Sequence, residues 1–141
     1  MITLLVSLVA NKLIISSQFV DRFNEGGPLF MSLILICLLL SVCFIVISFI
    51  NLKKNEHLSK KYIRLTTDTS LLGLVLGFLG SVIGLITAFD SIEAMGSPDP
   101  SIFAGGLKVS LLTATFGLFS FVIARIGILV LRWLTKEESV E

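Results

Sequence analysis

The side chains that could carry chemistry inside the long apolar runs of this sequence are hydroxyls. Four of them stand at depth in the second and third runs: Ser81, Thr87, Thr113 and Thr115. A hydroxyl can line a wet path or donate a hydrogen bond, but it does not hold a proton near neutral pH. A proton relay through a membrane needs a titratable group at depth, and no Asp or Glu occurs in residues 29–50, 71–89 or 102–132. We therefore expect either that the chain conducts nothing alone or that another polypeptide supplies the carboxyl.

Small residues mark one stripe along each of the same two runs. In the second run they recur at alternating spacings of 3 and 4, at Ser70, Gly73, Gly77, Gly80, Gly84, Thr87 and Ser91. In the third run they follow the same rule, at Gly106, Ser110, Thr113, Gly117, Ser120, Ala124 and Gly127. These spacings place each set on one face of a helix, and in a bilayer small residues let helix backbones approach closely. The stripes predict close packing, either between two helices of one subunit or, in addition, around a pore or a partner helix. The helix-packing candidates are Gly73, Gly77, Gly80, Gly84, Gly106, Ser110, Gly117 and Ser120.

Composition makes the chain an integral membrane protein. Of its 141 residues, 55% are hydrophobic and 15% are charged, which leaves no room for a separate soluble domain. A helix that crosses the hydrocarbon core needs about 20 apolar residues. Three stretches meet this requirement and predict an all-α membrane domain over residues 1–141: spans at 29–50, 70–92 and 102–133.

The charges of the connections predict the topology. Residues 51–69 carry five Lys and Arg against two acids, so the positive-inside rule places this loop in the cytoplasm. Residues 93–101 are acidic and are expected in the periplasm, and the tail at 134–141 returns to the cytoplasm. The amino terminus is then periplasmic.

Residues 1–20 predict an amphipathic helix lying in the membrane interface. Their polar side chains gather on one helical face, at Thr3, Ser7, Asn11 and Gln18. A surface helix of this kind buries its apolar face at the headgroup boundary. A short fourth span is the alternative.

Two cations lie within or beside the third span. Lys108 stands near its outer end, roughly opposite the small stripe, where it could meet Asp90, Glu93 or a neighbouring subunit. Arg125 stands near the inner end, where it could reach the headgroups or also pair between subunits. Cys37 and Cys43, in the first span, are expected to be small buried residues rather than a disulfide.

Several classes of function find no support in the sequence. No nucleophile–base pair, phosphate-cradling loop or metal-ligand cluster occurs, so we predict no catalytic residues, no metal, no cofactor and no enzyme. No basic patch with interleaved aromatic residues indicates nucleic-acid binding. Homo-oligomerisation and contact with lipid are the expected interactions.

The sequence resembles a known family at three places. GGPLFMSLILICLL opens the first span, LGLVLGFLGSVIGLITAFDSI forms the second, and DPSIFAGGLKVSLLTATFGL leads into the third. Together they are similar to the MotA/TolQ/ExbB proton-channel family of bacterial inner membranes, most specifically over residues 71–121. The LG-x-LG-S-V-x-G core, followed by AGG and V-x-LLTAT-x-G, carries the resemblance.

The resemblance implies a ring of subunits, typically a pentamer, around single-span helices of an ExbD-, TolR- or MotB-like partner. The partner's aspartate would carry the proton, and proton flow would drive rotation or a conformational stroke. Ser81 stands where members often have a threonine that faces this aspartate. The corresponding hydroxyl of the third span falls at Thr113 or one residue later, where this chain has Ala114, with Thr115 beyond.

Two departures from the family pattern are visible. Val109 occupies the place of a glutamate in ExbB- and TolQ-like members, and the large cytoplasmic region between the first two spans is reduced to about 18 residues. The leading hypothesis is a ring-forming subunit of a proton-driven motor or energy-transducing channel. A passive homo-oligomeric ion channel and a non-conducting membrane scaffold are the alternatives.

Overall fold

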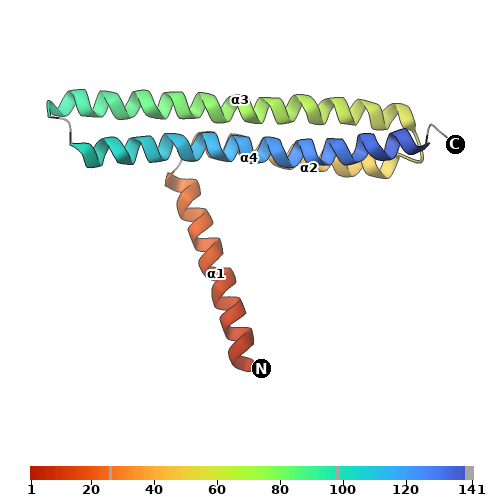
Figure 1. Ribbon diagram of the computed structural model, residues 1–141, viewed down its shortest axis with the longest axis horizontal. Helices are drawn as coiled ribbons and strands as arrows, with labels where there is room; N and C mark the ends of the chain where they lie inside the picture. Colours follow the sequence, from red (N-terminus) through yellow and green to blue (C-terminus); the bar gives the residue numbers. More distant parts are fainter. Residues whose placement is uncertain (26, 98, 139–141) are drawn as a thin grey trace.

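Four α-helices make up the chain in the computed structural model, which describes residues 1–25, 27–97 and 99–138. They are α1 (Ile2–Glu25), α2 (Pro28–Asn51), α3 (Glu56–Met95) and α4 (Pro100–Glu138). Figure 1 shows α3 and α4 side by side as a long antiparallel pair, against which α2 packs, while α1 leaves the bundle. The all-α fold with three helices long and apolar enough to cross a membrane is confirmed.

The second and third spans lie within much longer helices. α3 has 40 residues and α4 has 39, so each is about 60 Å long at 1.5 Å per residue. The hydrocarbon core of a bilayer is about 30 Å thick. Both helices therefore extend well beyond the lipid.

The predicted loop at residues 51–69 is helical from Glu56 onward, and only residues 52–55 connect α2 to α3. No glycine or proline interrupts residues 52–72, and the Lys60 ammonium pairs with the Glu56 carboxylate at 2.6 Å one turn apart. Hydrogen bonding to Lys60, with the attraction of its charge, lowers the pKa of the Glu56 carboxyl. Ser59, Ile63 and Thr66 are buried, so packing inside the bundle extends the helix through the charged segment.

The turn between α3 and α4 is defined by its capping residues. Gly96 has φ 68°, a left-handed conformation that suits glycine at the end of a helix. Asp99 precedes α4, and its Oδ1 accepts hydrogen bonds from the Ser101 amide at 2.9 Å and the Ser101 hydroxyl at 2.8 Å. These bonds, the amide first, lower the pKa of Asp99. α4 consequently begins at Pro100, before the expected start of the third span.

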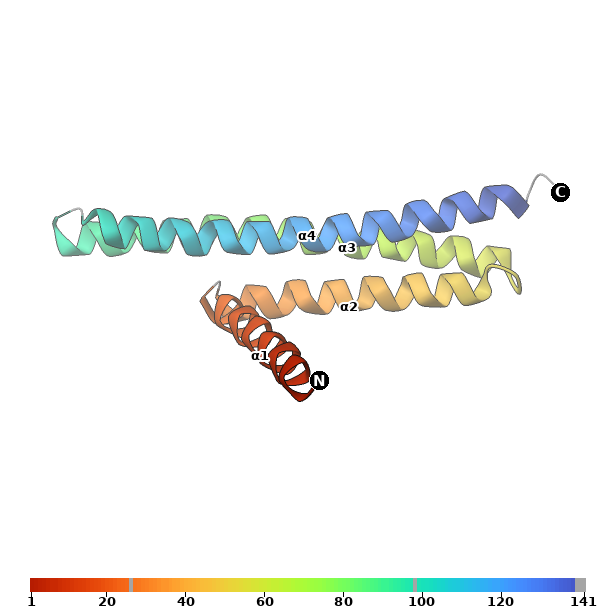
Figure 2. The same ribbon diagram turned by 60° about the horizontal axis from the view of Figure 1, so that its bottom comes forward.

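α2 begins about halfway along the α3–α4 pair (Figure 2). Phe30, in its first turn, lies at the level of Gly80 and Thr113, since a Cβ added to Gly80 would lie 2.8 Å from Phe30 Cγ and 2.9 Å from Thr113 Cγ2. Beyond this level, residues 81–95 and 100–112 continue as a two-helix extension without α2. At the other end, Ile63, Ile128 and Leu131 form a buried apolar cluster.

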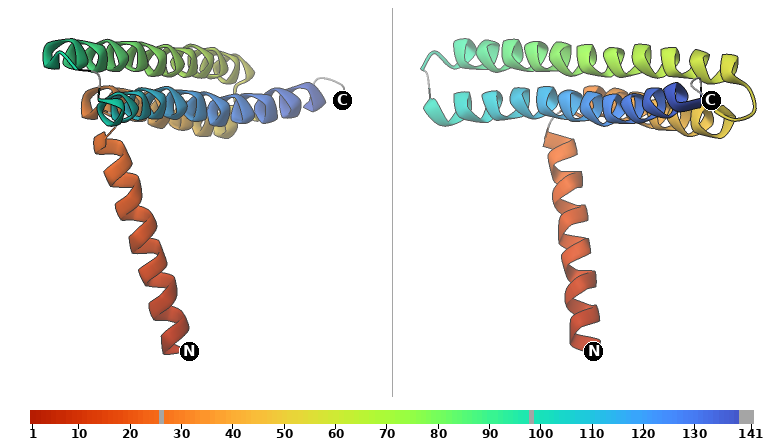
Figure 3. Two further views of the ribbon diagram at one scale, coloured as in Figure 1. Left: turned by 60° about the vertical axis from the view of Figure 1, so that its left-hand side comes forward. Right: turned by 45° about the vertical axis from the view of Figure 1, so that its right-hand side comes forward.

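α1 runs away from the bundle at a steep angle, as the two views of Figure 3 show. Its main contacts are with α2, and its large apolar side chains are exposed, with Leu4, Leu8 and Leu13 each more than half accessible. The described part of the chain thus has a three-helix bundle and one separate amphipathic helix.

Candidate functional site

The two small-residue stripes face one another inside the subunit. A Cβ added to Gly77 would lie 2.8 Å from Gly117 Cα, and one added to Gly117 would lie 2.9 Å from Gly77 Cα. Real Cβ atoms are not found so close to a backbone atom, so the two helices are in backbone contact here. Of the two arrangements that the stripes allow, packing between helices of one subunit is therefore present.

The same contact continues in both directions from this crossing. Gly84 lies under the Ser110 hydroxyl, with 3.2 Å from an added Cβ to Oγ, and Gly106 lies against Ala88. On the other side, Gly73 meets both Ser120 and, from α2, Cys37. Together with Gly77, Gly80 and Gly117, the whole predicted helix-packing set lies in contacts between helices. Gly105, next to Gly106, faces open space.

The four hydroxyls of the predicted proton path are not brought together on one face. Thr113 is 2% exposed and donates to the Val109 carbonyl at 3.2 Å. Thr87 and Thr115 are exposed and donate to the carbonyls one turn before them. At Ser81 the backbone carbonyl accepts a hydrogen bond from the Ser110 hydroxyl at 2.5 Å, which joins α3 to α4.

Ser81 and Ala114 define what we call the open edge of the α3–α4 contact. Gly80 faces both Phe30 of α2 and Thr113 of α4, and each step along a helix turns the side chain by about 100°. The next residues, Ser81 of α3 and Ala114 of α4, therefore lie on the other edge of the α3–α4 contact, the one away from α2. Both are half-buried. The open edge thus presents one hydroxyl, from α3, opposite a methyl group from α4.

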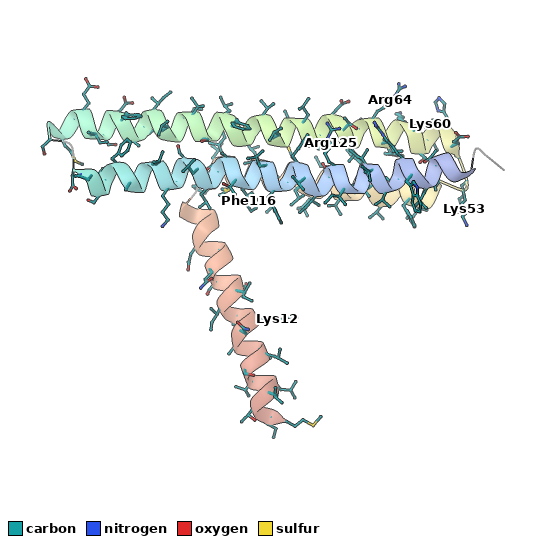
Figure 4. All side chains as sticks on the ribbon, in the orientation of Figure 1. Lys12, Lys53, Lys60, Arg64, Phe116 and Arg125 are labelled. Atoms are coloured by element: carbon teal, nitrogen blue, oxygen red, sulfur yellow. The ribbon has the colours of Figure 1, made fainter. Side chains whose placement is uncertain are left out.

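Arg125 lies on the same side of α4 as Ala114. Phe121, two turns after Ala114 and one turn before Arg125, lies between them on that side. Its guanidinium carbon is 4.7 Å from the centroid of the Phe121 ring, a cation–π arrangement. Its Nε is buried and has no hydrogen-bond partner among the described residues. Figure 4 labels Arg125 beside the α3–α4 pair. The open edge therefore carries a partly buried positive charge toward the cytoplasmic end of the predicted third span.

Lys108 is on a different face of α4. Its side chain is exposed and lines a shallow surface depression with Leu107, Leu111 and Thr115. This placement agrees with its predicted position opposite the stripe. The structure therefore assigns the two predicted inter-subunit charges to different surfaces, with only Arg125 on the open edge.

Sequence reasoning missed a pair of hydroxyls between α2 and α3. Ser48 and Ser59 are 0% and 1% exposed, and their Oγ atoms lie 2.9 Å apart. Each also donates to the other's backbone carbonyl, at 3.1 and 3.3 Å. Treating residues 51–69 as a loop hid this contact. The signal was the seven-residue spacing of Ser41 and Ser48, which lie on one face of α2.

The two cysteines differ in exposure. Cys37 is buried against Gly73, as expected, whereas Cys43 is exposed, so its predicted burial is wrong. Cys43 lies on the outward face of α2, because positions 37, 41 and 48 face the bundle. Both thiols are free. Among the described residues no group of three or more His, Cys, Asp or Glu side chains could hold a metal ion.

Comparison with known proteins finds similarity over the segment that contains α3 and α4. The model of the MotA/TolQ/ExbB proton channel family matches residues 47–141, which include α3 and α4. The biopolymer transport protein exbB1 of Vibrio cholerae serotype O1 is 36% identical over 77 residues, which cover 54% of this chain and 34% of that protein. The chain therefore spans about a third of the length of this curated relative. No solved structure matches the chain.

Proposed function

Since the chain belongs to the MotA/TolQ/ExbB proton channel family, we propose that it is the ring-forming subunit of an energy-transducing complex driven by the proton-motive force. In this proposal several copies surround a single-span partner, and the partner's aspartate carries the proton. The chain is a multi-pass protein of the bacterial inner membrane. Its family comprises channels and transducers, and an enzymatic role has no support.

The observation that carries the proposal is the chemistry of the open edge. Ser81 presents a hydroxyl at the depth where the family places a threonine facing the partner, and no Asp or Glu occurs in residues 29–50, 71–89 or 102–132. A proton path needs a titratable group that this chain does not bring. The Ser81 hydroxyl on the open edge can donate a hydrogen bond to a carboxyl supplied by another helix. Ala114 of α4 has no hydroxyl, so a second hydrogen bond to that carboxyl would come from the partner or from water.

The arrangement of α2 supports the same orientation. α2 covers one side of the α3–α4 pair and exposes large apolar side chains such as Leu33, Ile36 and Leu39. Such a surface suits lipid, so α2 belongs on the outside of the ring. The open edge, on the side away from α2, then faces the lumen.

The short connection between α2 and α3 leaves little room for a cytoplasmic structure between these two helices. Only residues 52–55 join the two helices, and the buried Ser48–Ser59 pair holds them together next to the turn. In this proposal the cytoplasmic part of the ring is formed by the lower turns of α3 and α4.

Purification of the tagged full chain from its native membrane tests the proposal. We expect native mass spectrometry to find a ring of identical subunits together with a single-span protein that has an aspartate within its apolar segment. A stable ring with only lipid at its centre would contradict the partner. Proton flux through the purified chain alone in liposomes would instead support a passive channel.

Cross-linking tests which face meets the partner. In a chain with both native cysteines changed to Ala, Ser81→Cys should form a cross-link to a cysteine scanned along the partner's apolar helix. Val75→Cys, on the exposed outer face of α3, is the matched control and should form none. The opposite pattern would place the lumen on the outer face of α3.

A further inference from the structure

Four basic side chains form one exposed stripe on the first turns of α3. His57, Lys60, Lys61 and Arg64 recur at i, i+3, i+4 and i+7, so they share one face of the helix. With Leu65 they line a shallow pocket of about 300 Å³. We call this set the basic stripe. The basic stripe is separate from the open edge and from the contact with α2. Figure 4 labels Lys60 and Arg64 near the end of the bundle where the α2–α3 connection, with Lys53, lies.

The stripe keeps an excess of positive charge after its internal pairing. Lys60 forms an ion pair with Glu56 at 2.6 Å. Lys61 and Arg64 have no ion pair within the described residues. Lys53 and Lys54, both exposed, adjoin the stripe in the α2–α3 connection. An uncompensated cluster of this kind beside a membrane span attracts anionic headgroups.

An apolar surface continues the same face of α3 toward the membrane. Leu71, Leu72, Val75 and Leu79 are each about half exposed. Leu72 is eight residues beyond Arg64, or about 12 Å along the helix axis. Past the single carboxylate of Asp68, the charged pocket therefore leads into a strip of apolar side chains, which is the shape of a ligand with an anionic head and hydrocarbon tails.

We propose that this face of α3 binds an anionic phospholipid. The phosphate is held by the Lys61 ammonium and the Arg64 guanidinium, whose planar fork matches phosphate oxygens, and the acyl chains lie along Leu71, Leu72 and Val75. In the predicted topology the lipid belongs to the inner leaflet. The site does not depend on proton transfer or on a partner.

Asp68 sets the depth of the phosphate. It lies one turn beyond Arg64 on the same face and is exposed. Its carboxylate repels a phosphate placed deeper, so the headgroup stays at the level of Lys61 and Arg64. Removing this charge by Asp68→Asn should increase the affinity for an anionic lipid.

Native mass spectrometry of the purified full chain in detergent tests the site. The protein is titrated with dioleoyl phosphatidylglycerol or with dioleoyl phosphatidylcholine, which has the same chains and no net charge. We expect a preference for phosphatidylglycerol that falls about five-fold for each of Lys61→Gln and Arg64→Gln. Arg64→Lys should retain part of the preference, and Lys12→Gln, which removes a lysine of α1, should retain all of it.

Three outcomes would overturn the proposal. An unchanged preference in the Lys61→Gln/Arg64→Gln double variant would place the anionic lipid elsewhere. Displacement of the lipid by soluble glycerol phosphate at equal concentration would show a phosphate site that takes no chains. Loss of the oligomer in the double variant, with unchanged lipid preference, would assign the stripe to contact between subunits. Size-exclusion elution and helical circular dichroism establish that each variant is folded.

Discussion

At the scale of single residues, glycine decides how closely α3 and α4 approach. Lipid gives little gain for burying one apolar side chain against another, so helices in membranes associate through close packing and hydrogen bonds. Gly77 and Gly117 supply this closeness at one crossing, where an added Cβ would touch the opposite backbone. A backbone atom cannot rotate aside, so any side chain here must separate the helices.

Alanine substitutions at two glycines of α4 should therefore differ in sign. Gly117→Ala should destabilise the bundle by about 1–3 kcal/mol, the usual cost of overpacking. Gly105→Ala meets nothing within 4 Å and removes a helix-propensity penalty of up to about 1 kcal/mol, so stability should hold or rise. Thermal unfolding in detergent, followed by circular dichroism, measures both. Equal losses would mean that the close crossing is absent.

The hydroxyl of Ser81 should matter for function and not for folding. The hydrogen bond from Ser110 is accepted by the backbone carbonyl of position 81, which alanine retains. Ser81→Ala should leave the oligomer intact and reduce proton-driven output several-fold when the complex is reconstituted with its partner. Thr87→Ala, off the open edge, is the comparison. An equal loss from Thr87→Ala would move the path away from the open edge.

At the scale of elements, buried hydroxyls join helices where the sequence has few large contacts. The Ser48–Ser59 pair joins α2 to α3, and the Ser110–Ser81 bond joins α3 to α4. The Ser48–Ser59 pair lies next to the short α2–α3 connection, whereas the Ser110–Ser81 bond lies within the predicted spans. The short connection is thus accompanied by a direct bond between the helices that it links.

A double-mutant cycle on Ser48→Ala and Ser59→Ala should show coupling. Hydrogen bonds between membrane helices average about 0.6 kcal/mol and reach about 1.7 kcal/mol, and this pair is fully buried with bonds in both directions. Chemical unfolding in detergent gives the coupling energy. Ser41→Ala is the control, because the buried Ser41 hydroxyl has no partner within the described structure, and its removal should cost nothing. A coupling of zero would contradict the assignment.

The start of α4 should respond to acid through Asp99. Its pKa is lowered by the bonds from Ser101, so the cap stabilises the folded helix above the ordinary carboxyl pKa of about 3.9. The contribution is lost as the pH falls through the lower folded-state pKa. The protection of the amides of residues 101–103 against hydrogen exchange, relative to the intrinsic exchange rate at each pH, should fall in that range. Asp99→Ala should show low protection at every pH, and a fall in protection with acid that persists in this variant would rule out the cap as its cause.

At the scale of the whole molecule, the level of α2 and the direction of α1 shape the assembly. α2 starts beside Gly80, so residues 81–95 and 100–112 of the α3–α4 pair extend past it, and α1 leaves at that same level. Five apolar side chains of α1 share one face, at Ile2, Leu5, Val6, Val9 and Leu13. The predicted polar side chains occupy the opposite face. This asymmetry between its faces is that of an interfacial helix, whereas its level beside Gly80 is the middle of the predicted span 70–92.

Tryptophan scanning should separate an interfacial α1 from a fourth span. In a Trp133→Phe background, Val9→Trp should be quenched by lipids brominated on the acyl chain, and Asn11→Trp should be quenched by aqueous iodide. The two positions differ by two residues and lie on opposite faces, so an interfacial helix gives opposite responses. Matching responses at both positions would indicate a helix that crosses the membrane.

The helices, the spans and the small stripes were predictable from the sequence because their causes are local. A run of about 20 apolar residues without charge crosses lipid as a helix, and residues at spacings of 3 and 4 share a face wherever the helix is placed. The same applies to α1, whose polar and apolar residues alternate with the helical period. The helical start of α3 at Glu56 was missed because its charged side chains resemble a loop until the burial of Ser59 and Ile63 is known.

Which surfaces meet was decided only by the tertiary structure. The spacing of a small stripe is the same whether it faces a helix of its own subunit or a guest, so the pairing of Gly77 with Gly117 required the register of α3 against α4. That register turns Thr113 inward and leaves Ser81 and Ala114 on the open edge. The level of α2 determines which side of the α3–α4 pair is left uncovered. It follows from contacts between residues far apart in the sequence, such as Phe30 with Gly80 and Gly80 with Thr113. Local periodicity sets the face of each helix, and only packing over such distances sets its neighbour.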